Sequence, residues 1–477
     1  MFVGREREMA RLAEALRRVR ETGAAGFVWL RGRRRVGKSR LVQELCDAAG
    51  VPYCFFQAPA RGREDALAAF VDAVADSSLD AAPAFDGASY RSWPAALRAA
   101  VRGATPEQPA ILVIDELPYL VEHDAGFAAD LQQAWDRTLE SAPVLLVCIG
   151  SDVRMMDELV RERAPLHGRP TLELRVAPLD PRAVGELTGA TDAADAFDRY
   201  LIVGGFPLLA ASWPRGTSVS EFLRGALADD QTPFVTMALR IMASEFQRDL
   251  QAERVLAAIG AGEVVHNRIS ARSGVKGNTL SDALDVLVVK KELVAKSLPY
   301  CVPARRQPAR YSVIDAYLRF WLRFVGSGIE ELSRGRADLV LARVERDWPT
   351  YRGRAIEPVV REALERLLVD PALSTRLGDA RHVGSWWRRD HSVEVDLVGG
   401  DAPDPDRLGF VGSVKWREDS RFSAADARVL SEARALVPGA AATRLVAVSR
   451  TGVEAGAEVD VALSPEDLLE AWSESRA

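Results

Sequence analysis

The chain contains Gly32-Arg33-Arg34-Arg35-Val36-Gly37-Lys38-Ser39 directly after the apolar run Gly26-Phe27-Val28-Trp29-Leu30. A strand, a loop bounded by glycines and ending in Lys-Ser, and a helix that begins near Lys38 form the pattern of a phosphate-binding P-loop. Glycine permits the tight turn that aims backbone N–H groups at phosphate, and the start of the helix adds its positive dipole end. We therefore assign the segment from Gly32 to Arg40 to nucleotide binding. Within it, Lys38 would reach the β- and γ-phosphates, and the Ser39 hydroxyl would be a ligand of Mg²⁺.

A second strand, Ala110-Ile111-Leu112-Val113-Ile114, is apolar on both faces and ends in Asp115 and Glu116. A strand of this kind belongs in the centre of a parallel sheet. Asp115 is placed to bind Mg²⁺, directly or through water, and Glu116 to orient and deprotonate the attacking water. The acid pair favours hydrolysis of the nucleotide over storage. The alternative is that the two carboxylates only cap the loop before Pro118.

A further apolar strand, Val144 to Ile149, leads into Gly150-Ser151-Asp152. If this strand lies between the P-loop strand and the strand that ends in Asp115, the sheet has the arrangement of the additional-strand class of P-loop ATPases. Ser151 would then lie beside the γ-phosphate and act as its sensor. The alternative, weighed equally, is that Ser151 is the N-cap of the helix that follows, since Ser and Asp are favoured at that position.

Composition limits the cellular setting and the partners. The chain of 477 residues has 62 Lys and Arg against 68 Asp and Glu, so its net charge of -6 gives no global signature of nucleic-acid binding. The four cysteines, Cys46, Cys54, Cys148 and Cys301, form no C-x-x-C pair, which fits a reducing compartment without structural zinc. No 18-residue apolar run and no secretory leader stand out, so we expect a cytoplasmic protein with no membrane contact.

The region after the predicted ATPase domain has the outline of a helical segment followed by a winged helix. A turn at Ser273 to Gly277 separates two helices, and strands are expected over Leu293 to Val302 and Arg310 to Val313. Two acids on the second helix, Asp282 and Asp285, oppose contacts with DNA phosphates. Five basic residues could make such contacts, namely Arg268, Arg272, Lys276, Arg305 and Arg306. The module either binds DNA or only packs against the nucleotide domain.

With these motifs in order, the chain resembles an archaeal-type ATPase family of the AAA+/STAND superclass. The resemblance rests on Phe2-Val3-Gly4-Arg5-Glu6, the P-loop, Asp115-Glu116, Cys148-Ile149-Gly150-Ser151, Pro165-Leu166-His167-Gly168-Arg169, Gly204-Gly205-Phe206-Pro207, Tyr311-Ser312-Val313-Ile314-Asp315 and Phe320-Trp321. It covers most of the chain and implies ATP, rather than GTP, with Mg²⁺. In similar proteins the first segment lies near the adenine, which places Phe2 and Val3 beside the base. The resemblance also places Pro207 in a nucleotide-sensing lid. Arg169 either stabilises phosphate charge or makes a structural ion pair.

The last part of the chain looks like the restriction-endonuclease-like domain that closes many members of this family. Its possible degenerate site consists of Glu357, Asp396 and Lys415. Glu357 lies on a helical segment, and Asp396 lies on an edge-on strand, on the same face as Glu394. Lys415 lies on the next strand. The nuclease pattern requires an acid two residues before the lysine, and this chain has Ser413 there. Loss of a carboxylate ligand weakens a metal site, so we favour a domain retained for binding or assembly. The run Trp386-Trp387-Arg388-Arg389 supports either nucleic-acid contact or packing.

The expected fold is therefore α/β, with a P-loop NTPase parallel sheet of the additional-strand class, a helical lid, a winged helix and a smaller endonuclease-like α/β domain. The predicted boundaries are 1–179 for the ATPase domain, 180–246 for the lid, 247–325 for the winged helix, 326–347 for a linker helix and 348–477 for the last domain. The expected function is a Mg²⁺-dependent ATPase that acts as a nucleotide-driven switch. The alternatives are a DNA-associated regulatory module with structural nucleotide, and an ATP-regulated nuclease. Double-stranded DNA, a protein partner and an oligomer all remain open.

Overall fold

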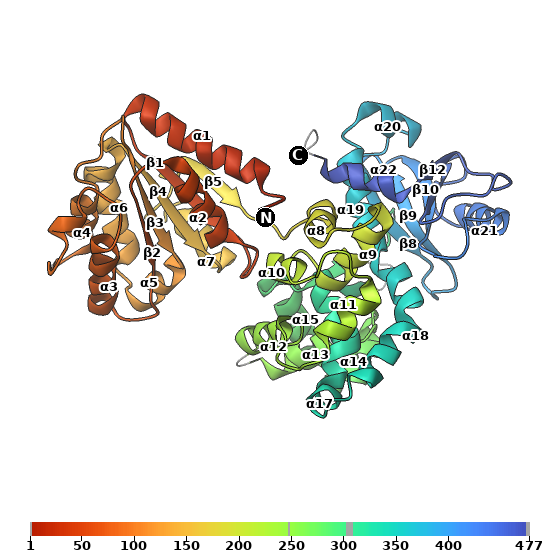
Figure 1. The fold of residues 1–477 in the computed structure, drawn as a ribbon. Helices are drawn as coiled ribbons and strands as arrows, with labels where there is room; N and C mark the ends of the chain where they lie inside the picture. The colour runs from red at the N-terminus through yellow and green to blue at the C-terminus, as the bar shows by residue number, and fades with distance from the viewer. Residues whose placement is uncertain (1, 247–248, 302–308, 474–477) are drawn as a thin grey trace. The chain divides into compact units, whose positions relative to one another are not determined.

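The computed structural model describes residues 2–246, 249–301 and 309–473 of the chain, which divides into two compact units (Figure 1). The first unit is Met1–Pro178 and the second is Leu179–Ala477. Each unit contains a five-stranded sheet with its own core. Among the described residues, none of the helices has the length and apolar character needed to span a bilayer.

The sheet of the first unit is parallel throughout, with the strand order β2-β3-β4-β1-β5. Its strands are β1 (Gly26–Arg31), β2 (Tyr53–Gln57), β3 (Ala110–Asp115), β4 (Val144–Gly150) and β5 (Leu172–Arg175). Strand β4 pairs with β1 on one side and with β3 on the other. The predicted additional-strand arrangement is therefore confirmed, because β4 separates the strand before the P-loop from the strand that ends in Asp115.

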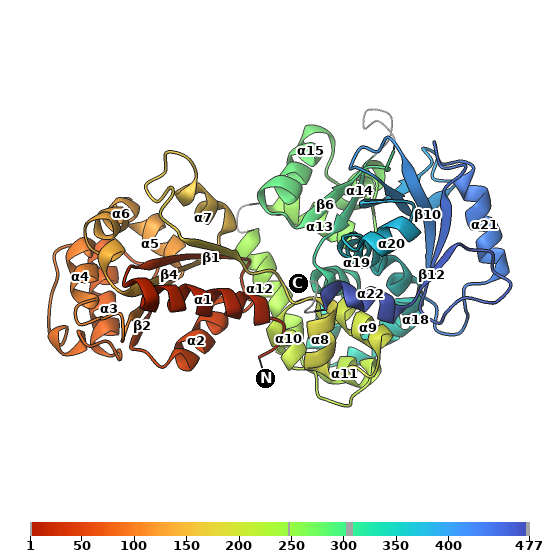
Figure 2. The same ribbon diagram turned by 90° about the horizontal axis from the view of Figure 1, so that it is seen from above.

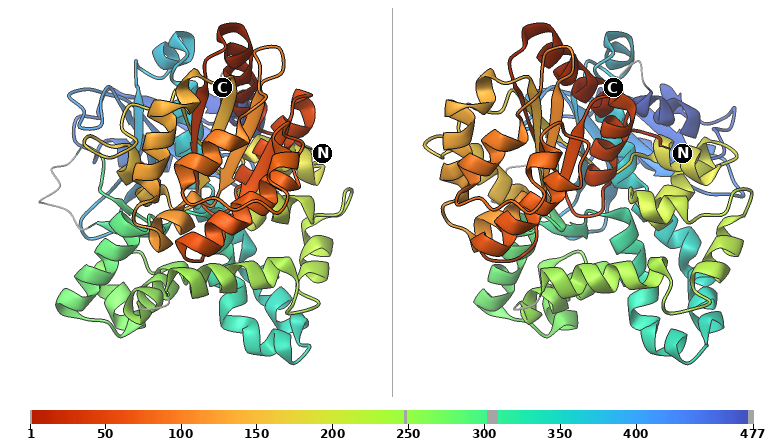
Figure 3. Two further views of the ribbon diagram at one scale, coloured as in Figure 1. Left: turned by 90° about the vertical axis from the view of Figure 1, so that its left-hand side faces the viewer. Right: turned by 60° about the vertical axis from the view of Figure 1, so that its left-hand side comes forward.

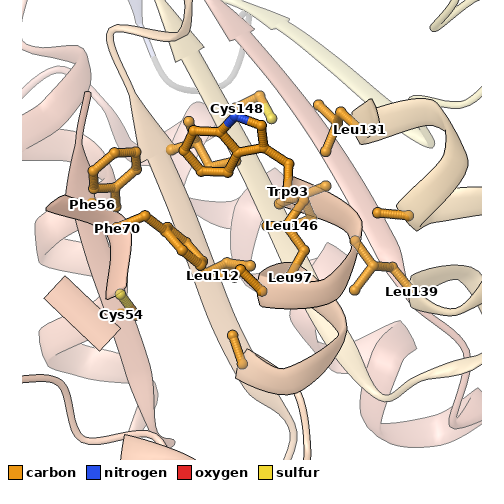
Figure 4. Packing of buried hydrophobic residues seen from close by; sticks show 14 of the residues in the cluster. Cys54, Phe56, Phe70, Trp93, Leu97, Leu112, Leu131, Leu139, Leu146 and Cys148 are labelled. Carbon is orange, nitrogen blue, oxygen red and sulfur yellow. The ribbon is translucent and has the colours of Figure 1, made fainter. Parts of the chain in front are cut away.

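Alternating apolar side chains give this sheet two buried faces. Phe27 and Trp29 of β1 pack on one face, and Val28 and Leu30 pack on the other. Figure 4 shows the first face, where Trp93 lies among strand and helix side chains. This face is covered by α3 (Arg63–Ala75), α4 (Trp93–Ala100), α5 (Leu117–His123) and α6 (Phe127–Arg137), and the opposite face by α1 (Glu6–Thr22) and α2 (Lys38–Ala49). Figures 2 and 3 show further views of helices on both sides of the sheet.

The second unit begins with helices and a short hairpin. The helices before the hairpin are α8 (Pro181–Thr188), α9 (Ala193–Val203), α10 (Pro207–Ala211), α11 (Val219–Ala226), α12 (Pro233–Glu245), α13 (Leu250–Gly260), α14 (His266–Ser273) and α15 (Gly277–Asp285). The hairpin pairs β6 (Val294–Ser297) with β7 (Arg310–Val313) in antiparallel register. The order of two helices followed by a hairpin agrees with the predicted order of elements, and the winged helix itself stays a prediction. The predicted wing loop with Arg305 and Arg306 lies outside the described residues.

The second sheet is mixed, with the order β12-β11-β10-β9-β8. Its strands are β8 (His382–Trp387), β9 (Glu394–Gly400), β10 (Leu408–Lys415), β11 (Arg444–Ser449) and β12 (Val461–Leu463). The nearby helices are α16 (Ala316–Phe320), α17 (Ile329–Ser333), α18 (Ala337–Ala355), α19 (Glu357–Leu367), α20 (Pro371–Arg376), α21 (Ala424–Arg434) and α22 (Pro465–Leu469). Strand β9 lies between β8 and β10, so the strand expected over residues 393–398 is an internal strand of the sheet.

Helix α9, which the sequence analysis placed in a separate lid, packs in the core of the second sheet. Phe197 contacts Trp416 and Trp472 edge to face, with ring centroids 5.5 and 6.1 Å apart. One turn of α9 also carries Asp198, which is 4% exposed and accepts hydrogen bonds from Trp416 and from two arginines. The helix is therefore fixed to the sheet by both apolar contacts and buried charge.

The two arginines that donate to Asp198 come from distant parts of the chain. Arg352 of α18 and Arg450 after β11 each place a guanidinium nitrogen 3.0 Å from Asp198 Oδ2. Helix α18 runs through residue 355 and so crosses the predicted boundary between residues 347 and 348. In this unit α9, the end of α18, α19 and α22 share one core with the sheet, and α9 and α18 meet at Asp198.

Candidate functional site at the carboxyl edge of the first sheet

Three neighbouring strands of the first unit end at one edge of the sheet, and each is followed by predicted site residues. The P-loop follows β1, Ser151 follows β4, and Asp115 and Glu116 stand at the end of β3. Ligands of open parallel sheets bind outside the carboxyl ends of the strands. The parallel pairing therefore brings residues 32–40, 115–116 and 151 together, although they are far apart in the sequence.

The backbone of the phosphate loop requires glycine at two positions. A Cβ on Gly32 would lie 2.4 Å from the carbonyl oxygen of Val176, so any other residue would push the loop away from the end of β5. Gly37, at φ 92°, is the N-cap of α2 in a left-handed conformation that suits glycine. Arg35 also has a positive φ of 69°. The loop therefore curves around the start of α2, with Lys38 as the first helical residue.

Lys38 is buried at the base of this loop. Lys38 is only 6% exposed, and its Nζ donates to the carbonyl oxygen of Arg33 at 3.0 Å. Burial lowers the pKa of its ammonium group, while Glu116 and Asp115 act in the opposite direction. An ammonium group carries three donors, so a buried lysine that donates to one carbonyl oxygen has donors left to bind an anion.

Ser39 and Asp115 form the predicted magnesium pair. The Ser39 hydroxyl donates to Asp115 Oδ2 at 2.7 Å, and Oδ1 accepts from the backbone N–H of Glu116 at 2.9 Å. Asp115 is 4% exposed, and burial raises its pKa. A hydroxyl and a carboxylate side by side are hard oxygen donors of the kind that Mg²⁺ prefers. The two residues therefore fit the ion, which would neutralise phosphate charge and orient the phosphates when bound.

Glu116 lies next to Ser151, and its backbone is unusual. Its φ of 54° is left-handed, a conformation that costs a non-glycine residue free energy and clusters at functional sites. The Ser151 hydroxyl donates to Glu116 Oε2 at 2.8 Å. Asp152, not Ser151, caps the following helix α7 (Val153–Val160) by accepting from the N–H of Met155. The structure therefore disfavours the alternative of Ser151 as an N-cap.

The remaining predicted nucleotide residues are placed as follows. Val3 is buried and Phe2 half-buried against the core beside α1 and α2. Pro207 is the first residue of α10 and belongs to the second unit, so its relation to the phosphate loop stays a prediction. Arg169 makes a bidentate ion pair with Asp136, both contacts at 2.8 Å, which favours the structural alternative for this residue.

Arg5 belongs to the opening motif of the chain, but the motif alone predicts no contact for its side chain. Arg5 is 5% exposed, and its Nη2 donates to the carbonyl oxygens of Val36 at 3.0 Å and Ala177 at 2.6 Å. The side chain thus ties the start of the chain to the phosphate loop and to the segment after β5. The Gly-Arg-Glu pattern was the available signal, but spacing alone does not say which carbonyls an arginine reaches.

The possible degenerate nuclease site also assembles, but its polar groups are internally bonded. Asp396 Oδ2 accepts from Ser413 Oγ at 3.0 Å and from the N–H of Val414 at 2.8 Å. Arg361 donates to the carbonyl oxygen of Asp396 at 3.0 Å and lies 3.8 Å from the Glu357 carboxylate. Burial and the neighbouring Asp396 raise the pKa of Glu357 to about 8. Lys415, half-buried, acts electrostatically on Asp396.

The Glu357–Asp396–Lys415 cluster is not arranged as a metal site. Among the described residues, no set of three or more His, Cys, Asp or Glu side chains is arranged to hold an ion. Ser413 therefore fills with a hydroxyl the position where the nuclease pattern has a carboxylate. Trp386 and Trp387 are both buried, which agrees with the packing alternative for these two residues.

The hairpin β6–β7 contacts the second sheet close to that cluster. Arg310 of β7 pairs with Glu394 and lies 4.3 Å over the ring of Trp387. Before the gap in the described residues, the N–H of Tyr300 donates to the carbonyl oxygen of Ser385 at 2.8 Å. The exposed basic residues Arg268, Arg272 and Lys276 lie elsewhere, on and just after α14. These contacts give the hairpin an intramolecular packing role.

Comparison with known proteins gives two family matches. Residues 1–147 match the AAA ATPase domain, and residues 321–429 match a family described as archaeal and bacterial proteins of unknown function. No curated protein matches the chain.

Three solved structures illustrate the structural matches. A Walker-type ATPase of Pyrococcus abyssi is 16% identical over 68% of this chain and 96% of its own, with a TM-score of 0.46. The ORC2 protein of Aeropyrum pernix is 14% identical over 71% of this chain and 94% of its own, with a TM-score of 0.44. A RuvB mutant of Thermotoga maritima is 16% identical over 62% of this chain and 91% of its own, with a TM-score of 0.32. Residues 1–147 thus match the AAA ATPase domain, and the strand order agrees with the parallel P-loop NTPase sheet that the sequence predicts.

Proposed function

We propose that this protein binds ATP and hydrolyses it in a Mg²⁺-dependent reaction, and that the nucleotide cycle acts as a switch. The observation that carries the proposal is the position of Glu116. This carboxylate follows Asp115, whose side chain touches Ser39 of the phosphate loop, and it is also held by Ser151 of the adjacent strand. One sheet edge thus combines a phosphate cradle, a magnesium pair and a general base.

The residues would divide the work as follows. Lys38 and the loop N–H groups bind the phosphates, and Ser39 with Asp115 would hold the magnesium ion. Glu116 orients a water molecule and accepts its proton while that water attacks the γ-phosphorus. The bond to the β–γ bridging oxygen breaks, and ADP leaves with that oxygen. Ser151 fixes the Glu116 carboxylate through the hydroxyl that donates to it at 2.8 Å.

The nucleotide signal would reach the second unit through the lid that the resemblance predicts, with Gly205 and Pro207 at its sensing element. Gly204 precedes this element with φ 59°, and a Cβ there would lie 2.9 Å from the backbone nitrogen of Tyr317. Residues 204–207 are thus held tightly against α16. The tight packing supports a rigid connection from the sensing element to the rest of the second unit.

A DNA-associated role is the second candidate, and exposed basic side chains near one turn favour it. Arg268, Arg272 and Lys276 all face solvent on or after α14, where they can meet phosphates. The exposed acids Asp282 and Asp285 on α15 oppose such contacts. Nuclease activity has less support, because Asp396 already accepts from Ser413 and Val414.

The test is phosphate release by the full chain with Mg-ATP, with and without double-stranded DNA, in the wild type and three variants. Lys38→Ala should remove nucleotide binding. Glu116→Gln should keep ATP affinity and lower kcat by about 10²- to 10⁴-fold, the range typical of a general base. Arg18→Ala is the matched control, because its exposed ion pair with Glu14 lies on α1 and has no part in the proposed site.

The outcomes separate the candidates. Turnover in the Glu116→Gln variant equal to the wild type would remove the proposed role of this residue. Turnover that DNA stimulates would establish a DNA-coupled ATPase, whereas slow turnover indifferent to DNA would indicate a switch with a protein partner. Nucleotide that stays bound without phosphate release would favour the structural-nucleotide alternative.

A further inference from the structure

The phosphate loop carries three consecutive arginines, and the side chain of Arg34 reaches across the sheet edge. Its Nη2 donates to the hydroxyl of Tyr119 at 3.1 Å, and its Nε donates to the hydroxyl of Ser151 at 3.4 Å. Tyr119 belongs to the first turn of α5, which follows Glu116, and Ser151 follows β4. The guanidinium group of Arg34 therefore connects the ends of three adjacent strands.

This guanidinium is linked to the proposed general base through one hydroxyl. Ser151 Oγ accepts from Arg34 and donates to Glu116 Oε2 at 2.8 Å. Arg34 also lies near enough to Lys38 that its positive charge lowers the pKa of the lysine. Two cations from one loop thus stand at the mouth of the site, one buried and one exposed.

The hydrogen-bond acceptors of the Arg34 side chain are weak compared with a phosphate. Both are neutral hydroxyl groups, and in the described part of the chain Arg34 makes no ion pair with a carboxylate. Guanidinium binds phosphate oxygens through paired, charge-assisted hydrogen bonds, which are stronger than bonds between neutral partners. A terminal phosphate at the loop would therefore compete successfully for this side chain.

We propose that Arg34 is a ligand of the γ-phosphate, supplied by the phosphate loop itself, and that it gives the site its preference for ATP over ADP. The inference rests on the proposed function, because it assumes that the loop binds a nucleoside triphosphate. In this arrangement Arg34 exchanges Ser151 and Tyr119 for the terminal phosphate and stabilises the charge that develops during transfer. An arginine in the same chain performs this role in some P-loop enzymes, and a partner protein supplies it in others.

The experiment compares binding of ADP and of the non-hydrolysable β,γ-imido analogue of ATP, both with Mg²⁺, by titration calorimetry. The wild type should bind the imido analogue more tightly than ADP. Arg34→Ala should lose about 10- to 100-fold in affinity for the imido analogue, the range for hydrogen bonds to a charged group, and keep its affinity for ADP. Arg34→Lys should recover part of the loss, since it keeps the charge but not the paired donors.

Two further readouts show whether the effect is specific. Turnover by Arg34→Ala should fall by about 10²-fold or more at saturating ATP, because the lost contact acts on the transferring group. Arg18→Ala, which removes an exposed arginine from an ion pair on α1, should change neither the affinities nor the turnover. Since Arg34 is exposed, the Arg34→Ala variant should keep the thermal midpoint of the wild type, which confirms that the fold is intact.

Equal losses for ADP and the imido analogue would overturn the proposal, because Arg34 would then serve the loop or the inner phosphates. Unchanged affinities in Arg34→Ala, or a wild type that does not distinguish the two nucleotides, would also overturn it. A wild type that distinguishes them through Arg34 but releases no phosphate would sustain this inference and refute the proposed hydrolysis. A wild type that binds neither nucleotide would refute both.

Discussion

The carboxyl edge of the first sheet and the Glu357–Asp396–Lys415 cluster of the second sheet are built from similar residues but differ in what those residues bind. In both regions, acidic side chains lie near a lysine. At the first edge, Asp115 accepts from the Ser39 hydroxyl of the phosphate loop, and the cation Arg34 donates to two neutral hydroxyl groups. In the second cluster, Asp396 accepts from Ser413 and Val414, and Arg361 stands beside Glu357.

The difference shows that residue types do not by themselves indicate a ligand site. Buried polar groups are stable when every donor and acceptor has a partner inside the protein, and in the second cluster Asp396 Oδ2 has two such donors while Arg361 lies 3.8 Å from Glu357. A binding site instead keeps donors and acceptors whose best partners come from the ligand. By this criterion the first edge is a site, and the second cluster is mainly part of the packing of its sheet.

The largest expected effect is on magnesium at the first edge. Asp115→Asn should lower Mg²⁺-dependent turnover by about 10³-fold, because the variant loses the anionic ligand of an ion that contributes several kcal/mol to the transition state. Binding of ATP in the presence of EDTA should change little, since Lys38 and the loop remain. Phosphate release and nucleotide binding measured with and without metal test this expectation.

A matched variant in the second cluster tests whether the two regions act separately. Asp396→Asn removes the same charge from the other sheet and should leave ATP turnover nearly unchanged. A loss of turnover in Asp396→Asn as large as that in Asp115→Asn would contradict the separation of the two sites. Mg²⁺-dependent turnover retained by Asp115→Asn would contradict the assignment of its carboxylate to the ion.

The next effect concerns buried charge that serves structure. Asp198→Ala should lower the free energy of unfolding of the second unit by about 3 kcal/mol, because Arg352 and Arg450 would lose a buried carboxylate partner. Urea unfolding followed by tryptophan fluorescence measures this loss, since Trp416 donates to Asp198. Asp338→Ala is the control, because its ion pair with Arg336 is exposed to solvent and should contribute little to stability. Equal losses of unfolding free energy in the two variants would show that the buried carboxylate of Asp198 stabilises the fold no more than an exposed one.

The contrast between these residues also explains what the sequence could predict. The glycine spacing of the P-loop, the strands that are apolar on both faces and the acids at a strand end are local patterns, and they predicted the first sheet and its edge. The strand order followed because β4 was expected between the strands bearing the P-loop and Asp115, as the structure confirms.

Long-range polar contacts could not be predicted in the same way. Asp198 meets Arg352, Trp416 and Arg450 across 154, 218 and 252 residues, and no local pattern encodes such pairings. The same limit applies to Arg5, whose partners are the carbonyl oxygens of Val36 and Ala177. Helix α9 therefore looked like part of a separate lid, because its amphipathic sequence did not show which surface it covers.

The smallest expected effect is a pH dependence in the second cluster. The folded pKa of Glu357 is about 8, raised from 4.5 by burial and by Asp396. Between these values the folded chain holds a proton that the unfolded chain releases. The stability that this carboxyl contributes is therefore fully present below about pH 4.5 and is lost as the pH rises through about 8.

Glu357→Gln replaces the protonated carboxyl with a neutral group of similar shape and should remove this part of the pH dependence. The variant and the wild type should unfold at similar urea concentrations at pH 5, and at pH 9 the variant should be the more stable of the two. Unfolding curves of both proteins in EDTA, recorded across this range, give the difference directly. A constant difference at every pH would mean that Glu357 ionises in the folded chain as it does in the unfolded chain, and that burial in the second cluster does not hold its proton.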